Sequence, residues 1–205
     1  LTADIADGNV YSVDIANSTI LNADLAPDSV LLDTLADAKS NNANTVFLGQ
    51  GAGGLNSGIN NLALGINALG DTNVNFSHTG ASNTAVGIDS LRFNTLGSYN
   101  TASGHQSLYN NTSGQNNTAI GYHALYTTTT GVNNTAVGMQ ALELADASAI
   151  GNVALGSVAL RENTSGSYNI AIGLASLRNN ITGHSNQAFG YGALFDTTGN
   201  RNIAV

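Results

Sequence analysis

A short motif, Asn-Thr-Ala-aliphatic-Gly, returns along most of this 205-residue chain. Its glycine, which we call the motif glycine, is found at Gly49, Gly65, Gly87, Gly104, Gly121, Gly138, Gly156, Gly173 and Gly190. Successive motif glycines are 16, 22, 17, 17, 17, 18, 17 and 17 residues apart. A nearly fixed period of this kind is typical of solenoids, in which each repeat forms one coil and packs against its neighbours.

Positions counted from the motif glycine as zero keep their residue types from repeat to repeat. Ala stands at −2 in every copy except the first, which has Phe47, and an aliphatic residue or Phe usually follows at −1. A small residue and Leu stand at +3 and +4, as in Ala124-Leu125, and a polar turn with a second glycine follows. This order predicts strand, corner, strand, corner, with glycines at the corners. We therefore expect an all-β, two-stranded parallel β-solenoid, a rod on the order of 45 Å long.

The Ala row at −2 predicts how chains associate. Alternate strand residues face opposite sides, and we expect the residue at −1 to join Leu at +4 in the core. The Ala at −2 then lies on the other face, close to something that tolerates no larger side chain, and a second chain is the natural candidate. The sequence thus predicts a homotrimer. The proposed contact row is Ala85, Ala102, Ala119, Ala136, Ala154, Ala171 and Ala188.

Three further sets of residues are candidates for structural or binding roles. Asn at −4 predicts a stacked amide ladder that stabilises the coils, formed by Asn83, Asn100, Asn117, Asn134, Asn152, Asn169 and Asn186. Position +5 predicts a surface stripe, which either grips a glycan or packs between adjacent coils, formed by Arg92, Tyr109, Tyr126, Arg161, Arg178 and Phe195. The long 22-residue spacing predicts a bulging contact loop, because loops on rigid scaffolds often bind, with Asp71, Asn73, Val74, Phe76 and His78.

The first 40 residues follow a different rule. Apolar residues recur every fifth position from Ile5 to Leu35, within a ten-residue superperiod. This spacing fits neither a helix nor a simple strand alternation. It suits a three-chain β-prism stalk or a square solenoid that resembles pentapeptide repeats. We expect residues 1–40 to form this short-period β stalk and residues 41–205 the solenoid, which stops in mid-repeat at Val205, so the sequence is expected to continue.

Composition and charge narrow the functional classes. Charged residues are 9 % of the chain, against roughly 25 % in average soluble domains, and the formal net charge is −8. No basic face is available for a nucleic-acid backbone, and no apolar run is long enough to span a membrane. The chain has no cysteine, and its histidines and carboxylates occupy unrelated repeat positions. We expect no metal site, no cofactor and no catalysis.

The Asn-Thr-Ala-Val-Gly-x-x-Ala-Leu repeat resembles the head repeats of YadA-like trimeric autotransporter adhesins. It is still more similar to the Asn-Thr-Ala-φ-Gly-Tyr-x-Ala-Leu arrays of bacterial and phage tail-fibre proteins. The resemblance covers residues 44–205. It implies a parallel β-roll with three chains side by side, although autotransporter heads have a shorter period.

These expectations define a function class. The sequence predicts a structural or adhesive segment of an extracellular trimeric fibre, on a virion, an injection particle or a bacterial surface. A tail fibre of a phage or contractile injection system that mediates attachment is the first interpretation, and the head of an autotransporter-type adhesin is the second. A carbohydrate-processing enzyme on a β-helix scaffold is the alternative from another class. The expected partners are further copies of the chain, other fibre or baseplate proteins, and a cell-surface glycan or protein receptor.

Overall fold

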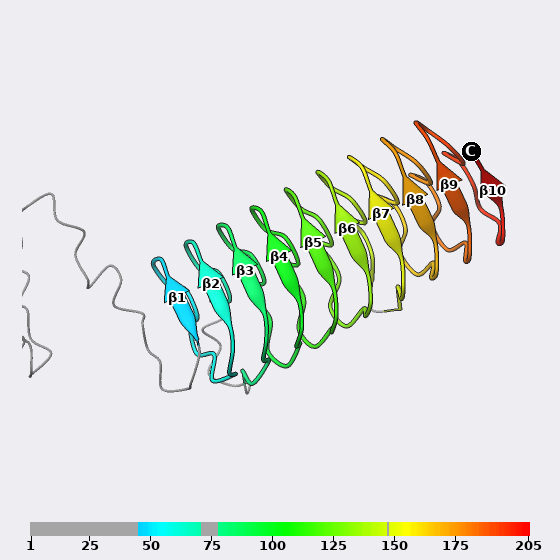
Figure 1. Ribbon diagram of the computed structural model, residues 1–205. Coiled ribbons are helices and arrows are strands. Elements are labelled where there is room, and N and C mark those ends of the chain that lie inside the picture. The colour runs from blue at the N-terminus through cyan, green and yellow to red at the C-terminus, as the bar shows by residue number, and fades with distance from the viewer. Residues whose placement is uncertain (1–44, 71–77, 147) are drawn as a thin grey trace, which may run out of the picture.

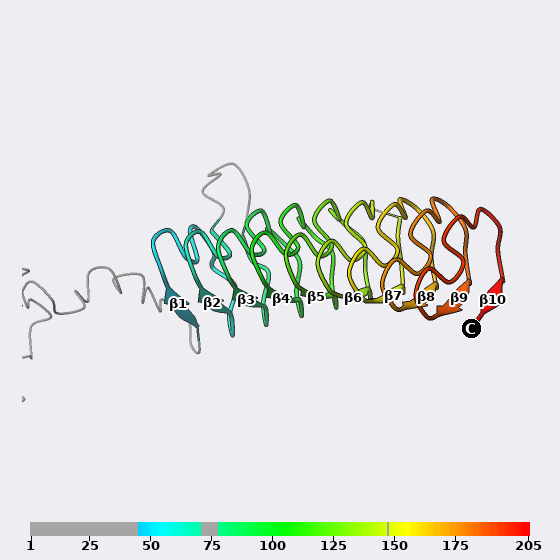
Figure 2. The same ribbon diagram turned by 90° about the horizontal axis from the view of Figure 1, so that it is seen from above.

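The chain folds into a β-solenoid of stacked coils whose ten strands form one sheet (Figures 1 and 2). The computed structural model describes residues 45–70, 78–146 and 148–205. The expected stalk over residues 1–40 lies outside these ranges. Each coil contributes one short strand to a single parallel sheet, whose strand order is the order of the sequence. The strands are β1 (Val46–Leu48), β2 (Leu62–Leu64), β3 (Thr84–Val86), β4 (Thr101–Ser103), β5 (Thr118–Ile120), β6 (Thr135–Val137), β7 (Val153–Leu155), β8 (Ile170–Ile172), β9 (Gln187–Phe189) and β10 (Ile203–Ala204).

The repeat period sets the register of the sheet. Ala85 of β3 pairs with Ala102 of β4, which pairs with Ala119 of β5. Even the long 22-residue repeat keeps this register, because Ala63 of β2 pairs with Ala85. Equivalent positions therefore stack in straight rows along the rod. The predicted all-β solenoid with coils of about 17 residues is confirmed.

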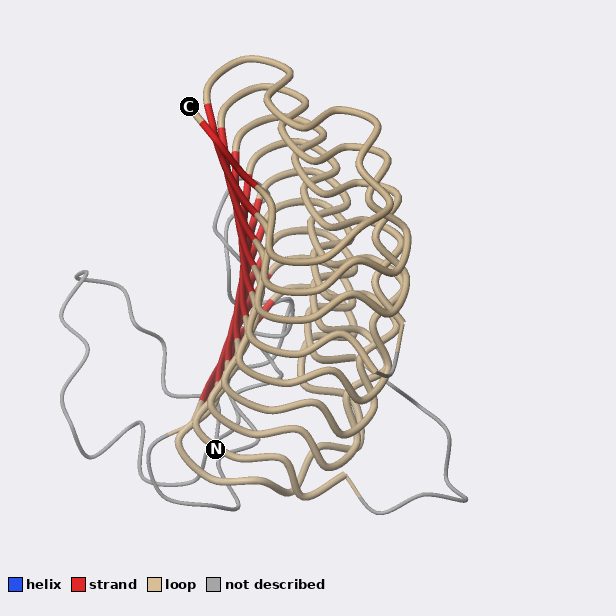
Figure 3. Cartoon of the chain, turned by 90° about the vertical axis from the view of Figure 1, so that its right-hand side faces the viewer, coloured by secondary structure: helices blue, strands red, loops and turns tan. Residues whose placement is uncertain are grey.

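The second half of each coil is not a strand, contrary to the sequence prediction. After the motif glycine the chain returns along the other side of the coil, as the tan loops in Figure 3 show. In this return segment the residues at +2 and +4 have left-handed backbone angles, for example φ 55° at Gln106 and 49° at Leu108. A strand requires extended angles with negative φ. The described part of each coil therefore carries one strand and a turn-rich return.

The motif glycine closes the corner between the strand and the return segment. Gly121 has a φ of 129°, and a Cβ added there would lie 2.6 Å from the carbonyl oxygen of Gly138 in the next coil. A side chain would therefore clash with backbone that cannot move without unstacking the coils. The same contact recurs from coil to coil, which explains why this glycine sets the repeat.

The interior of each coil is narrow and built from small side chains and one leucine. Ala119 at −2 and Leu125 at +4 are fully buried and belong to one apolar cluster that runs through the solenoid. Ile120 at −1, by contrast, is 41 % exposed. The residues at −1 therefore face outward and the Ala row faces inward.

This arrangement corrects the predicted trimer contact. Ala85, Ala102, Ala119, Ala136, Ala154, Ala171 and Ala188 all have no exposed surface within a single chain. They pack against the return segment of their own chain, so a second chain cannot reach them. The prediction of close packing at −2 was right, but the neighbour is the opposite wall of the same coil.

The first coil fills its interior with a different pair of residues. Phe47 takes the place of Ala at −2 and is buried, and Gly53 takes the place of Leu at +4. A Cβ on Gly53 would lie 2.3 Å from the Phe47 ring. The large side chain has therefore moved from one wall of the coil to the other, and the interior volume is kept.

Candidate interaction surfaces

The outer side of the sheet, which we call the strand face, is uncharged along its whole length and carries aliphatic, threonine and a few other polar side chains. It is formed by the residues at −3 and −1, which alternate with the buried Ala row. Three of its aliphatic side chains are Val46, Ile120 and Ile172, which are 49 %, 41 % and 37 % exposed. The −3 row is Val46, Leu62, Thr84, Thr101, Thr118, Thr135, Val153, Ile170, Gln187 and Ile203. The −1 row is Leu48, Leu64, Val86, Ser103, Ile120, Val137, Leu155, Ile172, Phe189 and Val205. None of these residues is charged.

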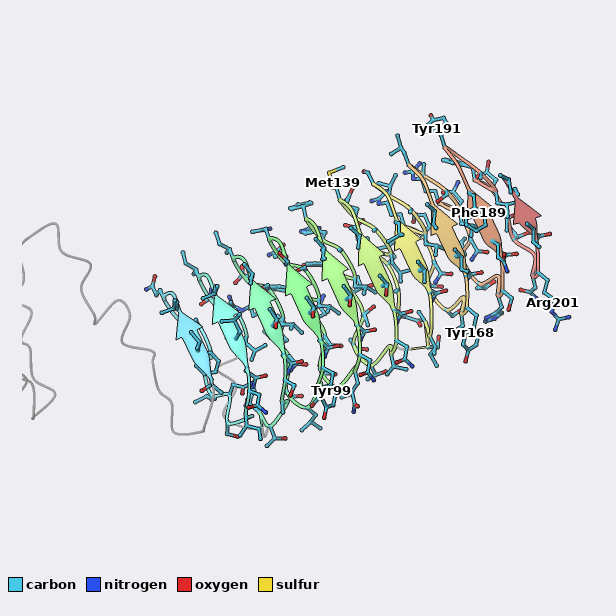
Figure 4. The ribbon with its side chains drawn as sticks, in the orientation of Figure 1. Tyr99, Met139, Tyr168, Phe189, Tyr191 and Arg201 are labelled. Atoms are coloured by element: carbon cyan, nitrogen blue, oxygen red, sulfur yellow. The ribbon has the colours of Figure 1, made fainter. Side chains whose placement is uncertain are left out.

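A second apolar row, the tip row, runs beside the strand face. It consists of the residues at +1, which project from the bend after each motif glycine. Met139 and Tyr191 show this position at the ends of their coils in Figure 4. The large apolar members of the row, all at least 44 % exposed, are Ile66, Ile88, Tyr122, Met139, Leu174 and Tyr191. Strand face and tip row together present a broad uncharged surface to solvent.

Inside the coil, the predicted Asn ladder is present. The backbone N–H of Asn117 donates to Oδ1 of Asn100, 3.0 Å away, and Asn134 donates to Asn117 in the same way. The amide nitrogen of Asn117 also donates to the Gly131 carbonyl at 2.8 Å. Each amide thus joins one coil to the next and the strand to the turn. The whole predicted set, from Asn83 to Asn186, is buried, so its role is structural.

A second interior ladder was not predicted from the sequence. Asn94, Asn111, Asn163 and Asn180 stand at +7 and are buried. Asn111 donates to Oδ1 of Asn94 at 2.7 Å and to the Gly114 carbonyl at 3.2 Å. These residues belong to the polar turns, where Asn is usual, so their turn position concealed their packing role. Their regular +7 spacing was the available signal.

The predicted stripe at +5 lies on the outer side of the return segment, which we call the second wall. The rings of Tyr109 and Tyr126 stack, with centroids 5.2 Å apart. Arg178 lies over the Phe195 ring at 5.6 Å. Arg92 forms an ion pair with Asp89 of its own coil. The stripe therefore packs between and within coils while its side chains stay partly exposed; contact with a receptor remains a prediction.

The stripe position of the sixth coil carries Glu143, which organises a polar network. Its carboxylate accepts hydrogen bonds from Arg161 Nε at 2.7 Å and from Gln140 Nε2 at 3.0 Å. His123 Nδ1 lies 3.2 Å from the same carboxylate, and His123 Nε2 lies 2.7 Å from Gln106 Oε1. We call Gln106, His123, Gln140, Glu143 and Arg161 the second-wall network.

Two tyrosine rings cover the imidazole of this network. The centroids of Tyr122 and Tyr126 lie 3.9 Å and 4.4 Å from that of His123, and both rings are nearly parallel to it. The four histidines stand at unrelated repeat positions in the sequence, so this arrangement was not predicted. The network draws on two repeat positions of four coils, +2 for Gln106, His123 and Gln140 and +5 for Glu143 and Arg161, so a pattern at one position alone does not reveal it.

The protonation of Glu143 is set by these partners. Burial alone would raise the pKa of this carboxyl, which is only 7 % exposed. The hydrogen bonds from Arg161, Gln140 and His123 and the charge of Arg161 outweigh burial and hold the pKa below its ordinary value. Asp89 has a lowered pKa for the same reason, since bonds from Arg92 and Asn67 outweigh its burial. Both carboxylates are ionised partners of arginine and poor proton donors.

The predicted contact loop falls mainly outside the described residues. Asp71, Asn73, Val74 and Phe76 belong to the undescribed range. His78 is described, and the structure corrects its assignment to an exposed surface. It is only 4 % exposed, and its backbone carbonyl accepts hydrogen bonds from Ser57. His78 is therefore part of the coil and not of a contact surface.

Comparisons with protein-family models, with curated proteins and with solved structures find no match for this chain. In residues 45–70, 78–146 and 148–205, no three or more His, Cys, Asp or Glu side chains gather closely enough to hold a metal ion. Across the same residues no helix has the length and hydropathy needed to cross a membrane.

Proposed function

We propose that this chain is a structural and adhesive segment of an extracellular trimeric fibre, most specifically of a tail fibre of a phage or contractile injection system. The observation that carries the proposal is the separation of surface types around the coil. The strand face has no charged residue, whereas seven of the nine charged side chains in the described ranges lie on the second wall. They are Asp89, Arg92, Glu143, Arg161, Glu162, Arg178 and Asp196.

An uncharged, apolar side and a polar side are what a chain needs when it packs lengthwise against other chains. Large exposed apolar patches on soluble proteins mark interaction sites, and the strand face extends over all ten strands. The extracellular setting comes from the resemblance of the repeat to tail-fibre and adhesin arrays. In this arrangement the second wall faces outward and offers its aromatic and arginine stripe to a glycan or protein receptor.

Light scattering on a chromatographed sample tests the assembly. The expected mass is about 62 kDa, three times the 20.8 kDa of one chain. A monomer that keeps its β-sheet circular dichroism would overturn the proposal. Attachment is tested separately by flow cytometry of bacterial cells mixed with the fluorescently labelled protein. A trimer that binds none of a broad panel of cells would contradict the adhesive role. The chain would then act only as a structural spacer in the fibre.

A further inference from the structure

We propose that His123 is a proton-operated switch on the second wall. In its protonated form it holds the second-wall network together across the coils of β4 to β7, and loss of the proton breaks one hydrogen bond of that network. Tyr126 and Arg161 of the stripe at +5 contact the network, so the switch regulates attachment through that stripe. This regulatory role rests on the proposed adhesive function, whereas the switch itself rests on the geometry of the network.

Both ring nitrogens of His123 face oxygen atoms. Nε2 lies 2.7 Å from Oε1 of Gln106, and Nδ1 lies 3.2 Å from Oε1 of Glu143. The ionised Glu143 carboxylate only accepts hydrogen bonds, and the oxygen of an amide accepts as well. A neutral imidazole has one N–H group and one lone pair, whereas the imidazolium donates from both nitrogens. Acceptors at both nitrogens therefore select the imidazolium.

The Gln106 amide presents its oxygen to His123 because its nitrogen has another partner. The Gln106 side chain also hydrogen-bonds the Asp89 carboxylate, and this bond helps to lower the pKa of Asp89. A hydrogen bond lowers the pKa of a carboxyl group when it is donated to the ionised form, so the amide nitrogen points to Asp89. The amide oxygen is then left for Nε2 of His123.

The surroundings of the ring favour a positive charge. The rings of Tyr122 and Tyr126 stack on it with centroids 3.9 Å and 4.4 Å away, and aromatic faces attract cations. Glu143 adds a negative charge at Nδ1, and it stays ionised in mild acid because its pKa is lowered. His105, whose centroid lies 6.3 Å away, repels the imidazolium only when it is itself protonated. The titratable and charged groups around His123 are Asp89, Arg92, His105, Tyr109, Tyr122, Tyr126, Glu143, Arg161 and Glu162.

Loss of the proton removes one contact between coils. The remaining proton stays on Nδ1, which faces the ionised Glu143, so Nε2 turns a lone pair toward the oxygen of Gln106. That 2.7 Å contact then becomes repulsive and the two groups must separate. His123 stacks on Tyr126, and Glu143 accepts from Arg161. The stripe is therefore held in one arrangement in mild acid and is released as the pH rises.

Nitrogen-15 NMR of the imidazole side chains tests the switch, because the nitrogen shifts distinguish imidazolium from each neutral tautomer. Histidine ordinarily changes charge between about pH 5 and pH 8. We expect imidazolium for His123 at the acid limit and the Nδ1–H tautomer at the alkaline limit. Gln106→Leu removes the acceptor at Nε2 and should weaken proton binding to His123 about tenfold. Gln115→Leu makes the same change at an exposed turn residue and should leave the titration unchanged.

Two results would overturn the switch. One is equal titration of His123 in Gln106→Leu and Gln115→Leu, and the other is the Nε2–H tautomer at the alkaline limit. The tautomer is measured in the wild-type chain, so it decides even where Gln106→Leu fails to fold. Circular dichroism of both variants checks that the coils are intact.

Flow cytometry of bacterial cells mixed with the labelled protein tests the regulatory role. We expect the wild type to lose bound fluorescence between about pH 5 and pH 8, the range in which histidine titrates. His123→Phe keeps an aromatic ring against the tyrosines but binds no proton, and it should show no such loss. A loss that persists in His123→Phe would overturn the regulation of attachment. A chain that binds no cells at either pH, with the NMR result as expected, would contradict the adhesive function and leave the switch established.

Discussion

Asn116 and Asn117 are neighbours in the sequence, yet the coil uses them in opposite ways. Asn117 is fully buried in the amide ladder, whereas Asn116 is exposed and has a left-handed φ of 56°. Asn tolerates that backbone region better than most residues. The same side chain therefore serves packing at −4 and backbone conformation at −5.

This pair gives a matched test of the ladder. Asn117→Asp keeps the shape but replaces the amide nitrogen, which donates to the Gly131 carbonyl at 2.8 Å, with an oxygen that repels it. We expect a loss of about 3 kcal/mol in the free energy of unfolding, because a buried donor is lost and a charge is added. Asn116→Asp makes the same chemical change on the surface and should alter stability by less than about 0.5 kcal/mol. Urea unfolding of both variants measures the difference in stability. Equal unfolding midpoints for the two variants would contradict a stabilising role of the amide ladder.

Glu143 predicts a pH dependence. Its pKa is lowered in the folded chain because Arg161, Gln140 and His123 outweigh the effect of burial. A lowered pKa means that the contribution to stability is present above the unfolded pKa, roughly 4.3. It is lost as the pH falls through the lower folded value.

Melting temperatures between pH 7 and pH 3 test this dependence. Glu143→Gln should destabilise the chain at pH 7 by about 1–2 kcal/mol, since hydrogen bonds to a charged group are lost at a site that is only 7 % exposed. The gap to the wild type should narrow below pH 4.3, because the Glu143 carboxylate protonates first in the unfolded chain and then, at its lower pKa, in the folded chain. Glu162→Gln, which removes a second ion pair of Arg161 at 3.1 Å, is the control. A gap that stays constant over the whole range would refute the linkage.

At the scale of one coil, Phe47 and Gly53 show that the interior conserves volume and not residue identity. Phe47→Ala should cost about 3–5 kcal/mol, because it empties a buried site. Adding Gly53→Leu restores the Ala and Leu found in the other coils and should recover most of that loss. Gly53→Leu alone should also destabilise, because its Cβ would lie 2.3 Å from the ring. Thermal unfolding of the three variants measures the coupling; additive losses would contradict compensation.

The coil shows which structural features a repeat makes predictable. The period of the motif glycines predicted the solenoid, its register and the number of residues per coil, because stacked coils must repeat the same corner. The facing of the strand was predicted incorrectly. Asn at −4 and Ala at −2 share one face and hardly vary along the chain, whereas −3 and −1 vary among Thr, Val, Ile, Leu, Ser, Gln and Phe. That contrast marks the interior, since a narrow core tolerates less variation than a surface.

Two other features could not be predicted from residue types. Leu at +4 has a left-handed backbone, for example φ 52° at Leu125, although branched aliphatic residues rarely adopt it. Stacking against neighbouring coils imposes this conformation against local preference. The network around Glu143 depends on contacts between four coils, so it emerges only when the coils are placed side by side.

At the scale of the whole molecule, the described part of the rod has one side free of charge and one side that carries seven of its nine charged side chains. Each coil adds uncharged surface on the strand face and polar surface on the second wall. Stacking therefore extends both surfaces continuously along the rod. A single repeat would offer too small an apolar area to hold another chain. Association along the rod therefore depends on the number of coils as much as on their sequence.

A charge placed at the middle of the strand face tests this dependence. Ile120 is 41 % exposed in one chain and lies on β5, so Ile120→Lys leaves the interior of the coil unchanged. In a trimer, three ammonium groups at one level would have to be desolvated without partners, at a cost of several kcal/mol each. We expect the mass in light scattering to fall from about 62 kDa, three times 20.8 kDa, to that of one chain. The β-sheet circular dichroism should be retained. Asn179→Lys adds the same charge on the second wall and should remain trimeric, and a trimer in both variants would show that the strand face is not buried.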